Sequence, residues 1–254
     1  MGSSKRTGKA HLSDLEWEMY PDPHGRPTSP VQIIAPDNPN VLNVQFPPGF
    51  EAGEHWHPFD TFYYMTKGSL RFGDEGVFGP GAVRWVKAGH AYGPEAAGPE
   101  GCEFILISFG GPIGLNWADI DAPPGASSAE GPLTGRALID DTPWEVFEDP
   151  AGRPTSPVKV LSSGVPSALY VKFEPGFSAG EHWHPFDTVY VMTQGALQFG
   201  DEGIFGPGDV RWVKAGHSYG PEAAGPEGCE FLLVSAGPIE LNWSDLLEPP
   251  TLQD

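Results

Sequence analysis

The chain has 254 residues and a formal net charge of −20, from 14 basic and 34 acidic side chains. This excess of acid argues against nucleic-acid binding, because a phosphate backbone requires clustered lysine and arginine. No apolar run approaches the roughly 20 residues that span a bilayer, and residues 1–9 lack the apolar core of a secretion signal. We therefore expect a cytoplasmic protein that binds neither nucleic acid nor membrane.

Glycine and proline are abundant, with 34 and 29 copies, and few stretches long enough for a helix lack them. Valine and aromatic residues are also prominent. This composition favours many short strands joined by tight turns over helices. We predict an all-β protein.

The sequence repeats itself once. Between Pro48 and Gly110, 51 of 63 residues are identical to the residue 127 positions later. Two copies with so long a period indicate paired domains rather than a solenoid. From composition and repeat bounds we expect a flexible tail at 1–16, a first domain at 17–117, a linker at 118–143 and a second domain at 144–254.

Within the first copy, short apolar segments alternate with turn residues in a regular way. Glycines between residues 68 and 81 divide the middle of the copy into hairpins. Strands at this spacing predict an antiparallel barrel or jelly roll. The expected strands are Val41–Phe46, a segment through His55 and His57, Thr61–Thr66, Val83–Val86 and Phe104–Ser108.

Histidines are clustered in the repeat. The heptapeptide His-Trp-His-Pro-Phe-Asp-Thr begins at His55 and again at His182, and a Lys-Ala-Gly-His segment follows in each copy, so that six of the eight histidines belong to these motifs. Residues i and i+2 of a strand face the same side, roughly 6.5–7 Å apart. Two such imidazoles can converge on a transition metal. Hydrogen-bonded core histidines are the alternative reading.

The spacing Gly49-x5-His55-x-His57-x10-Gly68, followed by Gly81-x7-Gly89-His90, resembles the two signature motifs of the cupin superfamily. The chain thus resembles a bicupin, with two tandem cupin-type jelly-roll β-barrels, and is similar to the ChrR-like branch. The resemblance implies one metal at the mouth of each barrel. The ligands would be two histidines and often a glutamate of the first motif, with a histidine of the second.

Two positions depart from the family pattern. The place of the glutamate is taken by Thr61, and the usual place of the last histidine by Tyr92. Because a shift of two residues preserves the face of a strand, the histidine two residues before Tyr92 stays a candidate ligand. We therefore expect a three-imidazole metal site in each copy, formed by His55, His57 and His90 and by His182, His184 and His217.

Other side chains are candidates for supporting roles. Arg84 and Lys87 could pair with acids at the surface or recruit an anionic substrate. Candidates for a catalytic role or for contacts with the ligands are Tyr92, Tyr219, Glu95 and Glu222, and candidates for a substrate pocket are Thr61, Thr188, Tyr63, Tyr190, Trp85 and Trp212.

Three functional hypotheses follow for a small-molecule substrate. The preferred one is an Fe(II) dioxygenase that acts on a small carbonyl or phenolic compound. A non-redox isomerase or lyase with zinc, nickel or manganese is the second, because an open site can act as a Lewis acid. A non-catalytic metal-binding or sensor cupin is the third. We also expect the two domains to pair as a pseudo-dimer, and association with further copies of the chain stays open.

Overall fold

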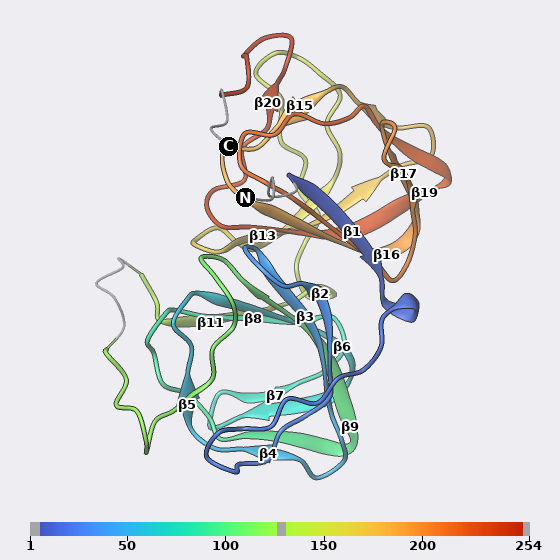
Figure 1. The fold of residues 1–254 in the computed structure, drawn as a ribbon. Coiled ribbons are helices and arrows are strands. Elements are labelled where there is room, and N and C mark those ends of the chain that lie inside the picture. Colours follow the sequence, from blue (N-terminus) through green and yellow to red (C-terminus); the bar gives the residue numbers. More distant parts are fainter. Residues whose placement is uncertain (1–5, 126–130, 251–254) are drawn as a thin grey trace. The chain divides into compact units, whose positions relative to one another are not determined.

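In a computed structural model, which describes residues 6–125 and 131–250, the chain divides into two compact units. The first unit is Asp14–Asp141, and the second joins Thr142–Asp254 to the N-terminal segment that ends at Ser13. Both consist of antiparallel strands, as predicted (Figure 1). The single helical element of the described residues is a 3-10 turn, η1 (Leu12–Asp14), and no helix there is long and apolar enough to span a membrane.

The first unit is an eight-stranded sheet with a small two-stranded sheet. The order along the large sheet is β11-β8-β6-β9-β3-β2, with β4 on β9 and β7 on β6, and β10 pairs with β5. The strands are β2 (Val31–Ala35), β3 (Asn40–Phe46), β4 (Glu51–Ala52), β5 (His55–Trp56), β6 (Thr61–Phe72), β7 (Gly76–Phe78), β8 (Ala82–Val86), β9 (Glu95–Ser108), β10 (Asn116–Trp117) and β11 (Thr134–Leu138).

Strands β6 and β9 are longer than predicted and run through positions where we expected turns. Their pairing shifts register on both sides of Gly68, which has a positive φ of 63°. A Cβ at this position would lie 2.9 Å from the Cα of Cys102 and nearer still to the carbonyl oxygen of Gly101. The glycine therefore lets the strand bend within the sheet instead of ending it.

The second unit repeats this arrangement in the order β1-β18-β16-β19-β13-β12, with β14 on β19, β17 on β16, and a separate β15-β20 pair. Its strands are β1 (Thr7–His11), β12 (Val158–Ser162), β13 (Ser167–Phe173), β14 (Ser178–Ala179), β15 (His182–Trp183), β16 (Thr188–Phe199), β17 (Gly203–Phe205), β18 (Asp209–Val213), β19 (Glu222–Ser235) and β20 (Asn242–Trp243).

The expected tail and linker are both corrected by the structure, because each contributes an edge strand. In the tail, β1 pairs with β18 of the second repeat, and in the linker, β11 pairs with β8 of the first repeat. The two strands occupy equivalent places, 127 residues apart. Each repeat therefore receives the edge strand that precedes the other repeat in the sequence. Both segments are short and polar, so their composition resembled that of a linker.

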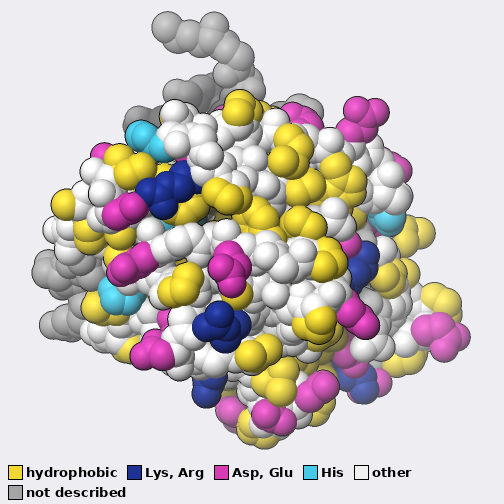
Figure 2. Space-filling model, turned by 90° about the horizontal axis from the view of Figure 1, so that it is seen from below, with side chains coloured by type: hydrophobic (Ala, Val, Ile, Leu, Met, Phe, Trp, Pro, Cys, Tyr) yellow, Lys and Arg dark blue, Asp and Glu magenta, His cyan; other side chains and the backbone are white. Residues whose placement is uncertain are grey.

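The core of each unit lies on the inner face of the bent sheet. In β3, for example, the side chains of Leu42, Val44 and Phe46 alternate inward and pack with Phe104 and Leu106 of β9. Outside, acidic side chains are scattered among apolar ones and basic ones are few on the face shown in Figure 2, as the net charge leads one to expect. The inner face is where the histidines of the repeat gather.

Candidate functional site

A buried pair of histidines forms the centre of the site in the first unit. His55 lies in β5 and His57 just after it, with ring centroids 5.3 Å apart and only 1% and 4% of the side chains exposed. The two residues stand on either side of Trp56, so that alternation turns both imidazoles to the interior. The predicted convergence of this pair is what the structure shows.

Backbone carbonyls set the tautomer of both rings. His55 Nδ1 lies 2.8 Å from the carbonyl oxygen of Gly53, and His57 Nδ1 lies 2.6 Å from that of Gly114. Because a carbonyl can only accept, each Nδ1 carries the hydrogen and each Nε2 keeps its lone pair. This is the orientation in which imidazole binds a metal, with a carbonyl behind it.

Both histidines are neutral at neutral pH. Burial lowers the pKa of His55 to about 4, with the charge of Arg84 adding to the effect. Burial and the neighbouring His55 lower the pKa of His57 to about 3. A neutral ring is the form that binds a cation.

Two tyrosines and a glutamate complete the buried polar group. The Tyr92 hydroxyl donates to His55 Nε2 at 3.0 Å and also bonds the Tyr63 hydroxyl, which lies 3.5 Å from His57 Nε2. Glu95, 2% exposed, has one carboxylate oxygen, Oε1, without a hydrogen-bond partner in the described residues. Burial raises the pKa of Glu95 to about 7, against the lowering effects of Arg84 and of a hydrogen bond from Tyr63.

Arg84 is a buried cation behind this group, and the expectation of a surface ion pair is wrong for it. Its side chain is fully buried and binds Glu75 through two hydrogen bonds of 2.9 and 2.6 Å. The guanidinium also lies over the rings of Phe72 and Tyr92, 4.4 and 4.2 Å from their centroids. Arg84 thereby helps to hold Tyr92 in place through a cation–π contact. Lys87 is also buried, and it pairs with Asp60 at 2.9 Å.

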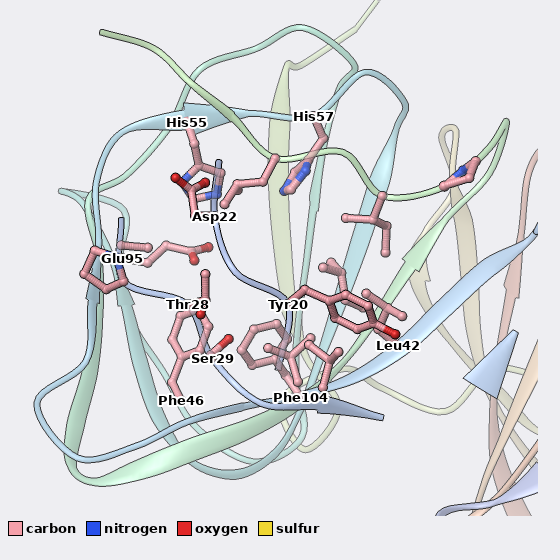
Figure 3. Close-up of a pocket in the computed structure, with 18 of the residues that line it drawn as sticks. Tyr20, Asp22, Thr28, Ser29, Leu42, Phe46, His55, His57, Glu95 and Phe104 are labelled. Atoms are coloured by element: carbon pink, nitrogen blue, oxygen red, sulfur yellow. The ribbon is translucent and has the colours of Figure 1, made fainter. Parts of the chain in front are cut away.

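The histidine pair opens into a cavity of about 560 Å³ in the first unit. Its walls are mainly apolar side chains of β2, β3 and β9, and Tyr63 and Glu95 also line it. In Figure 3, His55 and His57 lie at one end of the cavity, while Phe46 and Phe104 lie at the other. This volume and lining are typical of a pocket for a small organic molecule.

The segment that precedes β2 closes one side of the cavity. Asp22 accepts a hydrogen bond from Trp117 Nε1 at 2.8 Å, and Arg26 binds Asp119 at 2.5 Å. Tyr20 and Asp22 both line the cavity. The repeated Asp and Arg of this segment therefore fasten it to the barrel, which explains their recurrence in the second copy.

The second unit repeats the site. His182 and His184 have ring centroids 5.4 Å apart, and their Nδ1 atoms lie 2.8 and 2.6 Å from the carbonyl oxygens of Gly180 and Glu240. The remaining members, Tyr190, Tyr219, Glu222 and Arg211, occupy equivalent places and are buried. His184 Nε2 has no hydrogen-bond partner among the described residues. Glu222 lies 4.0 Å from His182 Nε2, and burial raises its pKa.

The third histidine of each expected set does not join the pair. His90 and His217 are half-buried, and their backbone N–H groups donate to Lys87 and Lys214 in a turn. The face-preserving argument fails because the chain turns here instead of continuing as a strand. Tyr92 stands directly opposite His55 instead, with backbone hydrogen bonds of 3.0 Å in both directions.

The predicted pocket residues separate into two groups. Tyr63 lines the cavity, and Tyr190 is its buried counterpart. Trp85 is not among the residues that line the cavity, and Trp85 and Trp212 lie over Gly135 of β11 and Gly8 of β1 on the edge strands. Thr61 and Thr188 are fully buried with unpartnered hydroxyls, and Thr61 is not among the residues that line the cavity.

Known structures share this architecture. A proposed dioxygenase from Nostoc punctiforme aligns with a TM-score of 0.71 and 15% identity, over 91% of this chain and 82% of that one. An oxalate decarboxylase from Lactobacillus farciminis, determined with formate, aligns at 0.62 and 18%, over 94% and 88%. A deletion mutant of the Bacillus subtilis oxalate decarboxylase aligns at 0.61 and 19%, over 95% and 80%.

The chain has the bicupin fold. No protein-family model and no curated protein matches the sequence, so that the likeness shows the fold alone. Placement near the ChrR-like branch stays a prediction.

The residues of this site can be compared with the ligands that a metal ion requires. No three histidine, cysteine, aspartate or glutamate side chains in the described residues are grouped to hold an ion by themselves. His55 Nε2 and the Tyr92 hydroxyl, however, are 3.0 Å apart, which is roughly the spacing of two neighbouring ligands with bonds of 2.0–2.2 Å. His57 Nε2 and the carboxylate of Glu95 belong to the same buried polar group, and imidazole and oxygen donors are the kinds of ligand that a divalent transition metal binds.

Proposed function

We propose that the chain is a metal-dependent bicupin enzyme with one centre in each barrel, and that its reaction is an Fe(II)-dependent oxygenation of a small carbonyl or phenolic compound. The observation that carries this proposal is the histidine pair at the end of the cavity. Each Nδ1–H donates to a backbone carbonyl, so that both Nε2 atoms face the buried polar group, where that of His55 accepts from the Tyr92 hydroxyl and would have to exchange this hydrogen bond for a metal. The same group contains Glu95, whose Oε1 has no hydrogen-bond partner among the described residues.

Each residue has a role that follows from its position. His55 and His57 would hold the metal in the first unit, with Tyr92 and Glu95 as oxygen donors. Tyr92 is kept in place by its hydrogen bonds to His55 and Tyr63 and by the guanidinium of Arg84. Bound iron would supply the redox chemistry through which dioxygen and an organic substrate react.

Glu95 can also move a proton. Its pKa of about 7 means that the carboxyl group exists in both protonation states near neutral pH. The unpartnered oxygen, which is Oε1, belongs to a residue that lines the cavity. Where it does not itself bind the metal, Glu95 could therefore take a proton from, or return one to, a substrate hydroxyl or an acidic carbon beside the histidine pair.

The neighbours support metal chemistry without selecting the metal. The Nostoc protein is a proposed dioxygenase, whereas the Bacillus subtilis oxalate decarboxylase contains Mn(II) centres, in a structure that aligns with a TM-score of 0.62 and 17% identity. A non-redox isomerase or lyase with manganese, zinc or nickel is therefore the second candidate. Glu95 favours it, because proton transfer by a buried carboxyl group needs no oxygen.

Metal analysis by mass spectrometry tests the proposal. Protein purified without added metal should contain about two metal ions per chain, one for each histidine pair. His57→Ala should remove the ion of the first unit and His184→Ala that of the second. His90→Ala is the matched control, and both ions should remain, because His90 lies outside the donor set.

Oxygen uptake then separates the two candidates. Iron in the protein and Fe(II)-dependent oxygen consumption with a carbonyl or phenol would support the oxygenase. Zinc, nickel or manganese without oxygen uptake would favour the isomerase or lyase. A chain that contains no metal and takes none up on incubation would refute both and leave a binding module without a metal.

A further inference from the structure

We propose that the cavity of the first unit selects a ligand with an apolar body and one hydrogen-bonding end, and that without a bound metal ion it prefers an uncharged ligand and excludes dicarboxylates. This names the substrate class of the enzyme proposed above and rests on that proposal for its catalytic meaning. The binding preference can be measured without turnover.

The walls of the cavity are suited to an apolar body. Leu42, Val44 and Phe46 of β3 and Phe104 and Leu106 of β9 face into it from two neighbouring strands. All five side chains are hydrocarbon, so a ligand that leaves water gains by contact with them. A ligand as small as oxalate would leave most of the 560 Å³ without contact.

In the described part of the chain, the same walls offer an anion no basic side chain, and their hydroxyl groups are those of Tyr20, Thr28, Ser29 and Tyr63. Among the described residues, no lysine or arginine lines the cavity, and its two acidic residues are Asp22 and Glu95. The nearby guanidinium of Arg84 is bound through Nε and Nη2 by both carboxylate oxygens of Glu75; its Nη1 has no hydrogen-bond partner among the described residues, but Arg84 is not among the residues that line the cavity. An anionic body would therefore lose its hydration beside carboxyl groups without gaining an ion pair.

The mouth of the cavity is apolar as well. Tyr20 and Leu115 line the cavity and yet are 51% and 43% exposed, and the exposed Pro36 and Pro112 line it beside them. Exposed apolar groups at the rim of a pocket are typical of sites that take an apolar ligand from water.

The polar groups fix the direction of the ligand. His55, His57, Tyr63 and Glu95 are the buried hydrogen-bonding side chains near the histidine end, opposite Phe46 and Phe104 (Figure 3). Asp22 already accepts from Trp117. A hydroxyl or carbonyl group at one end of the ligand would therefore point to the histidine pair, and the rest of the molecule to the aromatic floor.

Isothermal titration of metal-free protein with 2-naphthol and 2-naphthoate tests the preference, because these two rings differ in charge and little in shape. We expect 2-naphthol to bind roughly tenfold or more tightly than 2-naphthoate, and oxalate to show no binding. Equal or tighter binding of 2-naphthoate, or saturable binding of oxalate, would overturn the inference.

Variants assign the binding to this cavity. The second unit repeats most of the wall residues, so the number of sites is measured as well as the affinity. Leu42→Trp should fill the first cavity and lower the number of 2-naphthol sites by one. Val77→Trp, at a position 67% exposed, should leave the number of 2-naphthol sites unchanged. If Leu42→Trp does not fold by circular dichroism, Leu42→Ala should weaken binding through lost contacts. Unchanged binding in the folded Leu42 variant would refute the assignment.

The outcomes separate this inference from the proposed function. Binding of 2-naphthol by a chain that takes up no metal would refute the enzyme proposal and leave the ligand preference standing. A chain with its metals but without this preference would refute the ligand class and leave the enzyme proposal standing.

Discussion

Gly135 allows a test of how the edge strand β11 packs against β8. A Cβ at this position would overlap three ring atoms of Trp85, the farthest of them at 2.7 Å. Overpacking of this kind costs about 1–3 kcal/mol, and the better strand propensity of alanine returns about 0.5–1 kcal/mol. Gly135→Ala should therefore lower the free energy of unfolding by roughly 1–2 kcal/mol.

The effect of Gly135→Ala on the free energy of unfolding should change sign when the indole of Trp85 is removed. In a Trp85→Ala background the same Gly135→Ala change should stabilise the protein by about 0.5–1 kcal/mol. Urea unfolding followed by far-ultraviolet circular dichroism measures both changes without relying on the fluorescence of Trp85.

Gly164→Ala is the matched control, since its Cβ would meet nothing nearer than Ser162 Oγ at 4.0 Å. It should change stability by less than about 0.5 kcal/mol. A Gly135→Ala cost no larger than this, or one that persists without the indole, would show that β11 does not pack under Trp85. Gly8→Ala should behave like Gly135→Ala, because Gly8 lies under Trp212 in the same way.

Three further predictions concern the buried charges of the metal-free protein, each read from urea unfolding. The pKa of His57 is lowered from 6.5 to about 3, so its contribution to stability is complete above pH 6.5 and is lost as the pH falls. Between pH 7 and pH 5, His57→Gln should therefore lose about 2 kcal/mol less than the unchanged protein, in which His55 also contributes a loss. The pKa of Glu95 is raised from 4.5 to about 7, so the unchanged protein loses stability as the pH rises from 4.5 through 7. The difference in unfolding free energy between Glu95→Gln and the unchanged protein should therefore be about 3 kcal/mol more favourable to the variant at pH 8 than at pH 4. An equal difference at both pH values would contradict the burial of Glu95. Glu75→Gln leaves the buried charge of Arg84 without its partner and should lower the free energy of unfolding by about 3–5 kcal/mol. Adding Arg84→Met should restore part of this stability, because it removes the unpaired charge. If it restores none, the loss does not come from the broken ion pair.

Local pattern predicted the histidine pair because its geometry is local. His55 and His57 are separated by one residue, and strand alternation alone turns both rings inward. The place of Tyr92 and the burial of Glu95 were not decided in this way. Both depend on how the chain returns to His55 after a turn, and strand alternation does not describe a turn.

The same limit applies to Arg84. A strand pattern shows that its side chain shares a face with Ala82 and Val86, but a charged residue is usually placed at the surface. Its burial is stabilised by Glu75, from the turn after β6, and by the rings of Phe72 and Tyr92. These partners are brought together by the pairing of β6 with β7 and β8.

Sequence by itself determined the all-β class, the duplication and the histidine pairs, because each is expressed in composition or in spacing along one strand. Tertiary structure alone decided which repeat receives β1 and β11. The strands Thr7–His11 and Thr134–Leu138 are closely similar, and so are the edges β18 and β8 that they join. Local propensity is therefore equal for either pairing, and the choice falls to the long-range packing of the whole chain.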